Sequence, residues 1–276
     1  MSGLIDTGTT KIYREVRGSG PPLLLITGGT GDAGDWAAVA PALADSCIVV
    51  TYDRRGMSRS PRPVGWTATS IPEQADDAAA LLRGLELAPA VVAGHSGGAS
   101  IASGLVVRHP ELVRHAVLYE APLLAVVPDG EAVVAGYREV IGQAMAEGGP
   151  RLAMERFMRL NAGDQVVDQL LASVPPAELD RVLDNGATFF ELELPVFAGF
   201  VPDRDTLRAS GVPLTVAVGA DNRDNWHGAA SAWLAEGTGA ELVELPGGHA
   251  GLLTYPEAFA DLVRAIARRT AVTGSR

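Results

Sequence analysis

Cysteine is almost absent from this chain of 276 residues, and the one present, Cys47, excludes an intrachain disulfide. Cys47 lies within the apolar run "CIVVTY", so we interpret it as a small buried side chain. Long apolar runs are missing too, since pieces such as "PPLLLI" are far shorter than the roughly 20 residues of a membrane-spanning helix. The first residues show no basic segment followed by an apolar stretch, which predicts no secretory signal and a cytoplasmic location.

Positive charge is also scarce. The chain has 22 Lys and Arg against 33 Asp and Glu, for a formal net charge of −11 at pH 7. A chain of this sign is repelled by phosphate groups, which argues against nucleic acid or an anionic membrane as a partner. The sequence has no paired His or Cys at metal-ligand spacing and no G-x-x-x-x-G-K-[ST] phosphate loop, so we expect no metal and no cofactor.

Short apolar runs alternate with helical patterns along most of the chain. Ser70-Ile71-Pro72-Glu73 has the residues of a capping box, which predicts that a helix begins there. Because the apolar runs are continuous, they predict an α/β fold with a mostly parallel sheet that helices cover on both faces. The expected strands are 11–16, 22–27, 47–52, 90–94, 115–120, 213–219 and 240–245.

Residues 122–211 interrupt this alternation. Several helical patterns follow one another there, including "GEAVVAGYREVIGQAMAEG" and "PRLAMERFMRL", and no run predicts a strand. A helical block inserted between two strands is most simply a cap over one end of the sheet. We therefore expect one α/β core formed by residues 1–121 and 212–276, with residues 122–211 as a helical lid.

A candidate nucleophile lies in the middle of the chain. Gly94-His95-Ser96-Gly97-Gly98 forms a G-x-S-x-G motif directly after an expected strand and before a helical segment. The motif needs that context, because a sharp strand-to-helix turn strains the serine and the glycines remove clashing side chains. Backbone N–H groups at the start of the helix can then stabilise an oxyanion. Ser96 is the predicted nucleophile.

Together with this motif, three further segments resemble the α/β-hydrolase superfamily over essentially the whole chain. "YDRRGMSRSPRP" is similar to its D-x-R-G-x-G-x-S loop, with Ser58 where a second glycine is usual. "ELPGGHAGLLTYPEAF" resembles its last strand, catalytic-histidine loop and closing helix. "LLLITGGTGDAGDW" resembles the loop after an early strand, which implies that Gly29 or Thr30 joins Gly97 as a backbone donor to the oxyanion. The resemblance implies an α/β-hydrolase fold with a helical cap.

Five histidines are candidates for the general base. The resemblance puts His249 in the loop after the last strand, and its place downstream of Ser96 fits the chain order serine, acid, histidine. His227, at an expected helix start near the acid loop, is the second choice. The remaining three are His95, His109 and His115.

An amide occupies the usual position of the acid. Most members carry the acid in a G-x-x-D pattern before the histidine loop, whereas here Gly219 is followed three residues later by Asn222. An amide cannot carry the negative charge that stabilises an imidazolium. Glu120 is the favoured acid, because it ends the strand after the nucleophile helix and neighbouring strands lie only about 5 Å apart. Asp221 and Asp224 stay open as alternatives.

The segment "LYEAP" around Glu120 resembles the Y-E-x-P context of zearalenone-type lactonases and related esterases, whose acid lies at this strand end. That resemblance implies a Ser-His-Glu triad that cleaves a carboxylic ester or lactone through an acyl-enzyme. The cap is rich in apolar side chains, which favours a hydrophobic substrate, although many of them can simply pack the cap onto the sheet. They are Met154, Phe157, Met158, Leu160, Phe189, Phe190, Phe197 and Phe200.

Two other functions stay open on the same residues. A C–C hydrolase, or a cofactor-free perhydrolase similar to a haloperoxidase, uses the same triad, and a small-molecule receptor can retain the hydrolase fold. A serine nucleophile argues against an epoxide hydrolase or a dehalogenase, since those need a carboxylate at that position. As partner we expect a hydrophobic small-molecule ester or lactone. The sequence leaves monomer and homodimer open.

Overall fold

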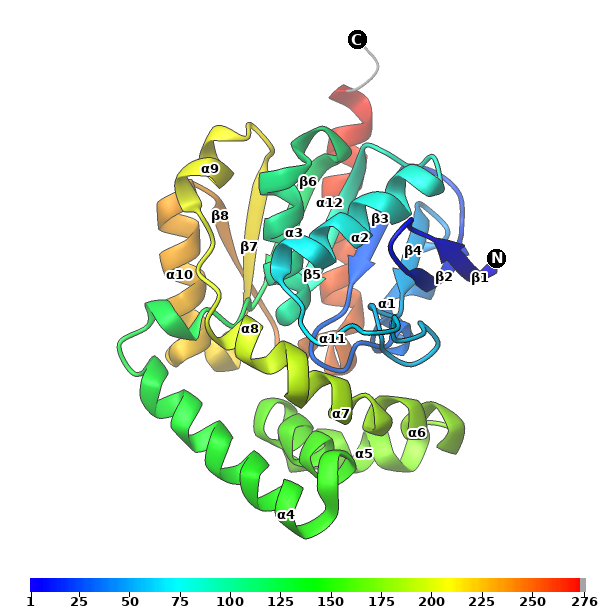
Figure 1. Cartoon of the computed structure of the whole chain (residues 1–276). Coiled ribbons are helices and arrows are strands. Elements are labelled where there is room, and N and C mark those ends of the chain that lie inside the picture. The colour runs from blue at the N-terminus through cyan, green and yellow to red at the C-terminus, as the bar shows by residue number, and fades with distance from the viewer. Residues whose placement is uncertain (274–276) are drawn as a thin grey trace.

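The computed structural model describes residues 1–273, with side chains described as far as Thr270. An eight-stranded sheet in the order β1-β2-β4-β3-β5-β6-β7-β8 runs through the molecule (Figure 1). β2 is antiparallel to β1 and β4, and all other neighbours are parallel. The strands are β1 (Ser2–Asp6), β2 (Lys11–Arg17), β3 (Pro22–Ile26), β4 (Ile48–Tyr52), β5 (Ala90–His95), β6 (Val113–Tyr119), β7 (Leu214–Gly219) and β8 (Glu241–Leu245).

The predicted α/β class and mostly parallel sheet are confirmed, and all seven expected strands are present. Sequence analysis missed β1, a short edge strand whose residues alternate between exposed and partly buried. Its pairing with β2 places Leu4 beside Tyr13, and the Leu4 side chain is still half exposed. So short a segment with little burial gives no apolar run for a sequence pattern to detect.

Helices cover both faces of the sheet. One face carries α2 (Ile71–Gly84), α3 (Gly97–Arg108), α9 (Arg204–Ala209) and α10 (Trp226–Thr238), and their buried side chains form one core cluster. The other face carries the short α1 (Val39–Leu43), α11 (Gly251–Thr254) and the long closing helix α12 (Pro256–Thr273). The expected capping box opens α2, where the Ser70 hydroxyl accepts from the Glu73 amide at 3.2 Å. Within residues 1–273 no helix has both the length and the apolarity to cross a bilayer.

Between β6 and β7 the described residues form helices and turns and no strand. We use the word cap for residues 122–203, because α9, within the expected 122–211, packs on the face of the sheet. Helices α4 to α8 lie together beyond one end of the sheet, at the bottom of Figure 1. They are α4 (Gly130–Ala162), α5 (Asp164–Ser173), α6 (Pro176–Asp184), α7 (Gly186–Thr188), the π-helical turn η4 (Phe189–Glu193) and α8 (Leu194–Ala198). The chain also has 3₁₀ turns η1 (Ala33–Trp36), η2 (Pro110–Leu112), η3 (Leu124–Val126) and η5 (Ala220–Asn222).

Helix α4 consists of two limbs. Gly149 has a φ of 73° and a ψ of −164°, which breaks the helix, and Pro150 begins the second limb. Proline lacks the amide hydrogen that would continue the helix and is favoured at a helix start. The two expected helices, "GEAVVAGYREVIGQAMAEG" and "PRLAMERFMRL", correspond to these limbs. The second limb therefore leaves the first at a sharp angle and runs to a different part of the cap.

One buried arginine joins the cap to the core. Arg54, after β4, is 1 % exposed and donates to Glu193 of the cap, which is fully buried. The same guanidinium donates to the Gly28 carbonyl at 2.8 Å and to the Gln74 side chain of α2 at 2.7 Å. Gln74 in turn donates to Glu193 at 2.8 Å. A buried charge pair of this kind is tolerated because hydrogen bonds satisfy both ions on several sides.

We predict that Glu193→Gln lowers the free energy of unfolding by about 3–5 kcal/mol, because it leaves the Arg54 charge buried without a counter-ion. Urea unfolding at neutral pH measures the change. Glu191→Gln is the matched control in the same turn, where an exposed carboxylate lies 3.0 Å from Arg62. Exposed pairs contribute at most about 1 kcal/mol. Equal losses in the two variants would contradict this account of the cap–core contact.

Candidate active site

Ser96 lies on a strained turn between β5 and α3. Its φ is 55° and its ψ is −127°, a conformation that costs a residue with a side chain of the order of 1–3 kcal/mol. Glycine is required nearby: a Cβ on Gly94 would lie 2.2 Å from the Gly98 carbonyl oxygen, and one on Gly98 would lie 2.1 Å from the Ile26 carbonyl oxygen. The motif therefore builds the turn that sequence analysis expects of it.

The loop after β3 runs directly beside Ser96. A Cβ on Gly28 would lie 3.3 Å from the Ser96 hydroxyl oxygen. Asp35 braces this loop, because its carboxylate accepts from the hydroxyls of Thr27 and Thr30. Burial raises the pKa of Asp35 to about 6, although those two hydrogen bonds oppose the rise.

The predicted oxyanion donors lie around the same serine. Gly29, Ser96 and Gly97 line one cavity, and Gly29, Thr30 and Ser96 line a second. The amides of Gly97 and Gly98 begin α3, where backbone N–H groups have no partner within the helix. This is the arrangement that an oxyanion needs, and the assignment of individual donors stays a prediction.

The Glu120 carboxylate is fully buried and surrounded by donors. It accepts from the Gly219 amide at 2.8 Å and from the Asn222 side-chain amide at 3.0 Å on both oxygens. His249 Nδ1 lies 2.6 Å from Glu120 Oε2. Burial by itself would raise the pKa of Glu120, but the hydrogen bond and charge of His249 outweigh it, and the pKa falls to about 2. The carboxylate is therefore ionised at neutral pH.

Two further side chains hold the loop of His249. His95 Nε2 lies 2.8 Å from the His249 carbonyl oxygen, and the Tyr119 hydroxyl donates to the Gly248 carbonyl at 2.8 Å. Because an ionised carboxylate can only accept, His249 Nδ1 must carry the proton in its bond to Glu120. The Nε2 atom of a neutral His249 then has a lone pair, which is the form a general base needs.

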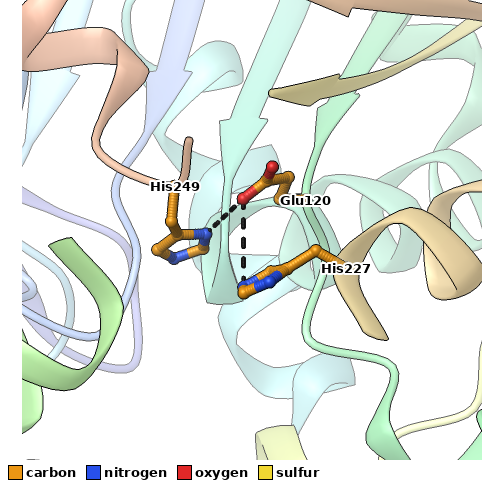
Figure 2. A group of neighbouring side chains, drawn as sticks. All are labelled: Glu120, His227 and His249. Atoms are coloured by element: carbon orange, nitrogen blue, oxygen red, sulfur yellow. Dashed lines mark hydrogen bonds and ion pairs between the residues drawn. The ribbon is translucent and has the colours of Figure 1, made fainter. Parts of the chain in front are cut away.

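His227 lies on the other side of His249. Figure 2 shows His249 and His227 both directed at the Glu120 carboxylate, from the histidine loop and from α10. The ring centroids are 4.8 Å apart, and those of His95 and His249 are 4.5 Å apart, so His249 stands between two other imidazoles. His227 Nε2 is 3.9 Å from Glu120 Oε2 and has no hydrogen-bond partner among the side chains described. It is too far away to replace His249 as the partner of Glu120.

Glu120, His227 and His249 place their donor atoms within 4.8 Å of one another, a spacing that a metal site also shows. The 2.6 Å contact between Glu120 Oε2 and His249 Nδ1 is nevertheless shorter than the separation of about 3.3 Å between two ligands of tetrahedral zinc. Gly219 and Asn222 also use the carboxylate as an acceptor. The geometry favours a hydrogen-bonded pair.

The two alternative acids lie elsewhere. Asp221 and Asp224 are exposed, and the Asp224 carboxylate lies 3.4 Å from the Arg223 guanidinium. Asn222, at the usual position of the acid, donates its amide to Glu120. Sequence analysis rejected Asn222 as an acid and missed this role, although an amide at that position was itself a signal that a carboxylate lies opposite.

Five of the eight apolar cap residues line one or both of two cavities beside Ser96. The first cavity has a volume of about 590 Å³ and is lined by Phe157, Phe189, Phe190 and Phe197, among others. The second has about 260 Å³ and is lined by Phe157 and Met158. Three of the apolar cap residues line neither: Met154 is fully buried in the cap, Leu160 is 44 % exposed, and Phe200 packs against the core cluster.

Residues 23–262 match the alpha/beta hydrolase family. The chain belongs to this family. An uncharacterized hydrolase of Bacillus subtilis (strain 168), YraK, is 31 % identical over 264 residues, which are 94 % of this chain and 93 % of that protein. The sequence similarity therefore covers nearly the whole length of both proteins.

Solved structures of distantly similar enzymes share the fold. The enol-lactonase of Burkholderia xenovorans LB400 superposes with a TM-score of 0.72 at 20 % identity, over 95 % of this chain and 98 % of that one. A bromoperoxidase of Bacillus anthracis superposes with a TM-score of 0.76 at 20 % identity, over 98 % of this chain and 100 % of that one. At this identity the likeness concerns the fold, and a specific reaction has to come from the site.

We predict that acid destabilises this hydrolase well before Glu120 is protonated. Desolvation and the neighbouring His249 lower the pKa of both His95 and His227 from 6.5 to about 3. Below pH 6.5 the unfolded chain therefore binds a proton at each of these histidines and the folded chain does not. Each histidine therefore lowers the free energy of unfolding by about 1.4 kcal/mol per pH unit once the pH is well below 6.5. Asp35 opposes one of these two contributions below about pH 6, because burial raises its pKa in the folded chain. Urea unfolding between pH 7.5 and pH 4.5 measures the slope.

The variant His227→Gln serves as the check, since it removes one of these protons. Its unfolding free energy should fall less steeply with pH than that of the wild type, by about 1.4 kcal/mol per unit. Identical slopes in the two proteins would show that His227 is not held neutral by the fold.

Proposed function

We propose that this hydrolase cleaves a carboxylic ester or lactone of a hydrophobic small molecule, using Ser96, His249 and Glu120 as a catalytic triad. The observation that carries the proposal is the 2.6 Å contact between His249 Nδ1 and a buried, ionised Glu120. Ser96 and His249 line the same two cavities, and the walls of both are mainly apolar. In this proposal Glu120 takes the role of the aspartate in the usual pattern. Asn222 occupies the position of that aspartate and donates a hydrogen bond to Glu120.

In the proposed reaction, His249 Nε2 takes the proton of the Ser96 hydroxyl as the oxygen attacks the carbonyl carbon. The negative charge moves to the carbonyl oxygen, which the Gly97 amide and an amide of Gly29 or Thr30 stabilise. The C–O bond to the leaving alcohol then breaks, and His249 gives that oxygen its proton. Water, deprotonated by His249, hydrolyses the acyl-enzyme and restores Ser96.

Glu120 acts on the base and never on the substrate. Its negative charge stabilises the imidazolium that forms on His249, and its hydrogen bond keeps the proton on Nδ1 so that Nε2 faces the reaction. The low pKa of Glu120 keeps it charged throughout. His95 and His227, whose pKa values are lowered, remain neutral and do not compete with His249 for that charge.

Ser96→Ala tests the nucleophile. We predict that the variant loses a factor of about 10⁴–10⁶ in kcat on a chromogenic short-chain ester, because the hydroxyl that forms the acyl-enzyme is gone. Stopped assays with a panel of esters and lactones measure the loss. A wild-type protein as inert as the variant on the whole panel would refute the proposed activity.

Glu120→Gln tests the acid, and the two exposed aspartates supply matched controls. We predict a loss of about 10³–10⁴ in kcat for Glu120→Gln, since an amide cannot stabilise the imidazolium or fix its tautomer. Asp221→Asn and Asp224→Asn should leave kcat nearly unchanged. Circular dichroism shows whether each variant folds. The reverse ranking would assign the acid to the loop after β7.

A further inference from the structure

Two apolar cavities open from the position of Ser96, one of about 590 Å³ and one of about 260 Å³. Building on the proposed function, we infer that the substrate is an acyclic ester with a hydrophobic group of several carbons on each side of the carbonyl. The acyl part occupies one cavity and the alkoxy part occupies the other.

The residues common to the two cavities are those at the reaction centre. Gly29, Ser96, Phe157, Asn161 and His249 line both. An ester carbonyl held at Ser96 therefore has one cavity for each of its two substituents. A site with a single pocket would instead hold one substituent and leave the other in solvent.

Different parts of the cap wall the two cavities. The first limb of α4 lines the larger cavity through Val134 and Ile141, and the segment from η4 to α8 adds Leu194. Helices α5 and α6 line the smaller cavity, through residues such as Leu170 and Val182. The break at Gly149 causes this division, because it sends the two limbs of α4 in different directions.

Phe157 and Asn161, on the second limb, fix the boundary between the cavities. The Phe157 ring packs on Phe189, with centroids 4.8 Å apart, and a Cβ on Gly29 would lie 3.0 Å from it. The Asn161 amide donates to the Phe157 carbonyl at 2.7 Å and accepts from the Tyr137 hydroxyl at 2.8 Å. Tyr137 belongs to the first limb, so this hydrogen bond ties the limbs together across the boundary.

The charged residues that line the two cavities are paired, hydrogen-bonded or exposed, so a hydrocarbon chain can bind in either cavity. In the smaller cavity, Asp32 pairs with Arg181, and Asp35 accepts from two threonine hydroxyls. Glu178 lies there as an exposed side chain, and Arg138 is an exposed side chain of the larger cavity. Each substrate methylene that is buried against an apolar wall should raise kcat/KM about three- to fourfold.

A separate cavity on each side of Ser96 distinguishes open-chain esters from lactones. In a lactone the acyl and alkoxy parts belong to one ring, so a small lactone has to place both in the same cavity. An open-chain ester can extend its parts in different directions. The division of the cap at Phe157 and Asn161 therefore favours the open chain.

The test uses two series of esters, one that lengthens the acyl chain of a methyl ester and one that lengthens the alkyl chain of an acetate. For the wild type we expect kcat/KM to rise about three- to fourfold per methylene in both series before it levels off. Val134→Trp fills the larger cavity and Leu170→Trp the smaller one, and each should remove the rise in one series only. Leu160→Trp, on an exposed residue that lines neither cavity, is the control and should change neither series.

Several results would overturn the inference. They are a rise in only one series, a loss of the same series in both tryptophan variants, or small lactones cleaved faster than the longest esters of both series. Thermal melting shows that the variants fold, and the control variant Leu160→Trp should cleave methyl acetate as fast as the wild type does.

A binding measurement separates this inference from the proposed reaction. Dialkyl ketones imitate the two arms of an ester without a leaving group, and calorimetry with Ser96→Ala measures their affinity without turnover. Affinity that rises with both alkyl chains supports the two cavities even if the wild type cleaves no ester, in which case only the proposed activity is wrong. If the wild type cleaves esters but the ketone affinity does not change with the length of one of the two alkyl chains, only this inference is wrong.

Discussion

The buried carboxylate of Glu120 is the constraint around which the site is arranged. A charge without exposure to water at the end of β6 is stable only because Gly219, Asn222 and His249 all donate to it. Those partners come from the end of β7, from the turn after it and from the loop after β8. One carboxylate therefore fixes the relative positions of three segments at the carboxyl edge of the sheet. Its own backbone is strained, with a φ of 46°, and the same hydrogen bonds hold it there.

The row of three imidazoles explains how one histidine is singled out. All three lie close to one another, but only His249 has a hydrogen bond to the carboxylate. His95 and His227 are held neutral, because removing them from water and placing them beside His249 both lower their pKa values. A positive charge in this cluster is therefore stabilised on His249. The flanking rings contribute shape and packing, and His95 also holds the loop of His249 through its carbonyl.

Most of the fold could be predicted from the sequence, because strands and tight turns depend on residues that are neighbours in the chain. Continuous apolar runs identified seven strands, and the glycines of the Ser96 turn were explained by contacts of about 2 Å that any Cβ would make. The pairing of Glu120 with His249 could be anticipated for a different reason. Asn222 stands where the acid is usual, so another carboxylate was needed. Parallel strands bring their carboxyl ends to one edge of the sheet, where Glu120 and the histidine loop both lie.

What the sequence could not supply are contacts between distant segments. Nothing near Glu193 in the chain indicates that it meets Arg54, which lies 139 residues earlier. Likewise, the sequence shows apolar cap residues without showing that Met154 is buried in the cap while Phe157 lines both cavities. The packing of the cap helices decides which face of each one meets the cavity.

The cap and the catalytic core are mechanically linked through Arg54. Its guanidinium holds both the Gly28 carbonyl, in the loop beside Ser96, and Glu193, in the cap turn that also carries Phe189 into the larger cavity. A displacement of that turn would pull on the loop that is proposed to stabilise the oxyanion. Because a buried ion pair loses far more when broken than an exposed one, this part of the cap is the least free to move. Opening for substrate entry should therefore involve α4 and α5, where the ion pairs of Arg159 lie within the cap. Helix α6 is tied to the core, because its Arg181 pairs with the buried Asp32.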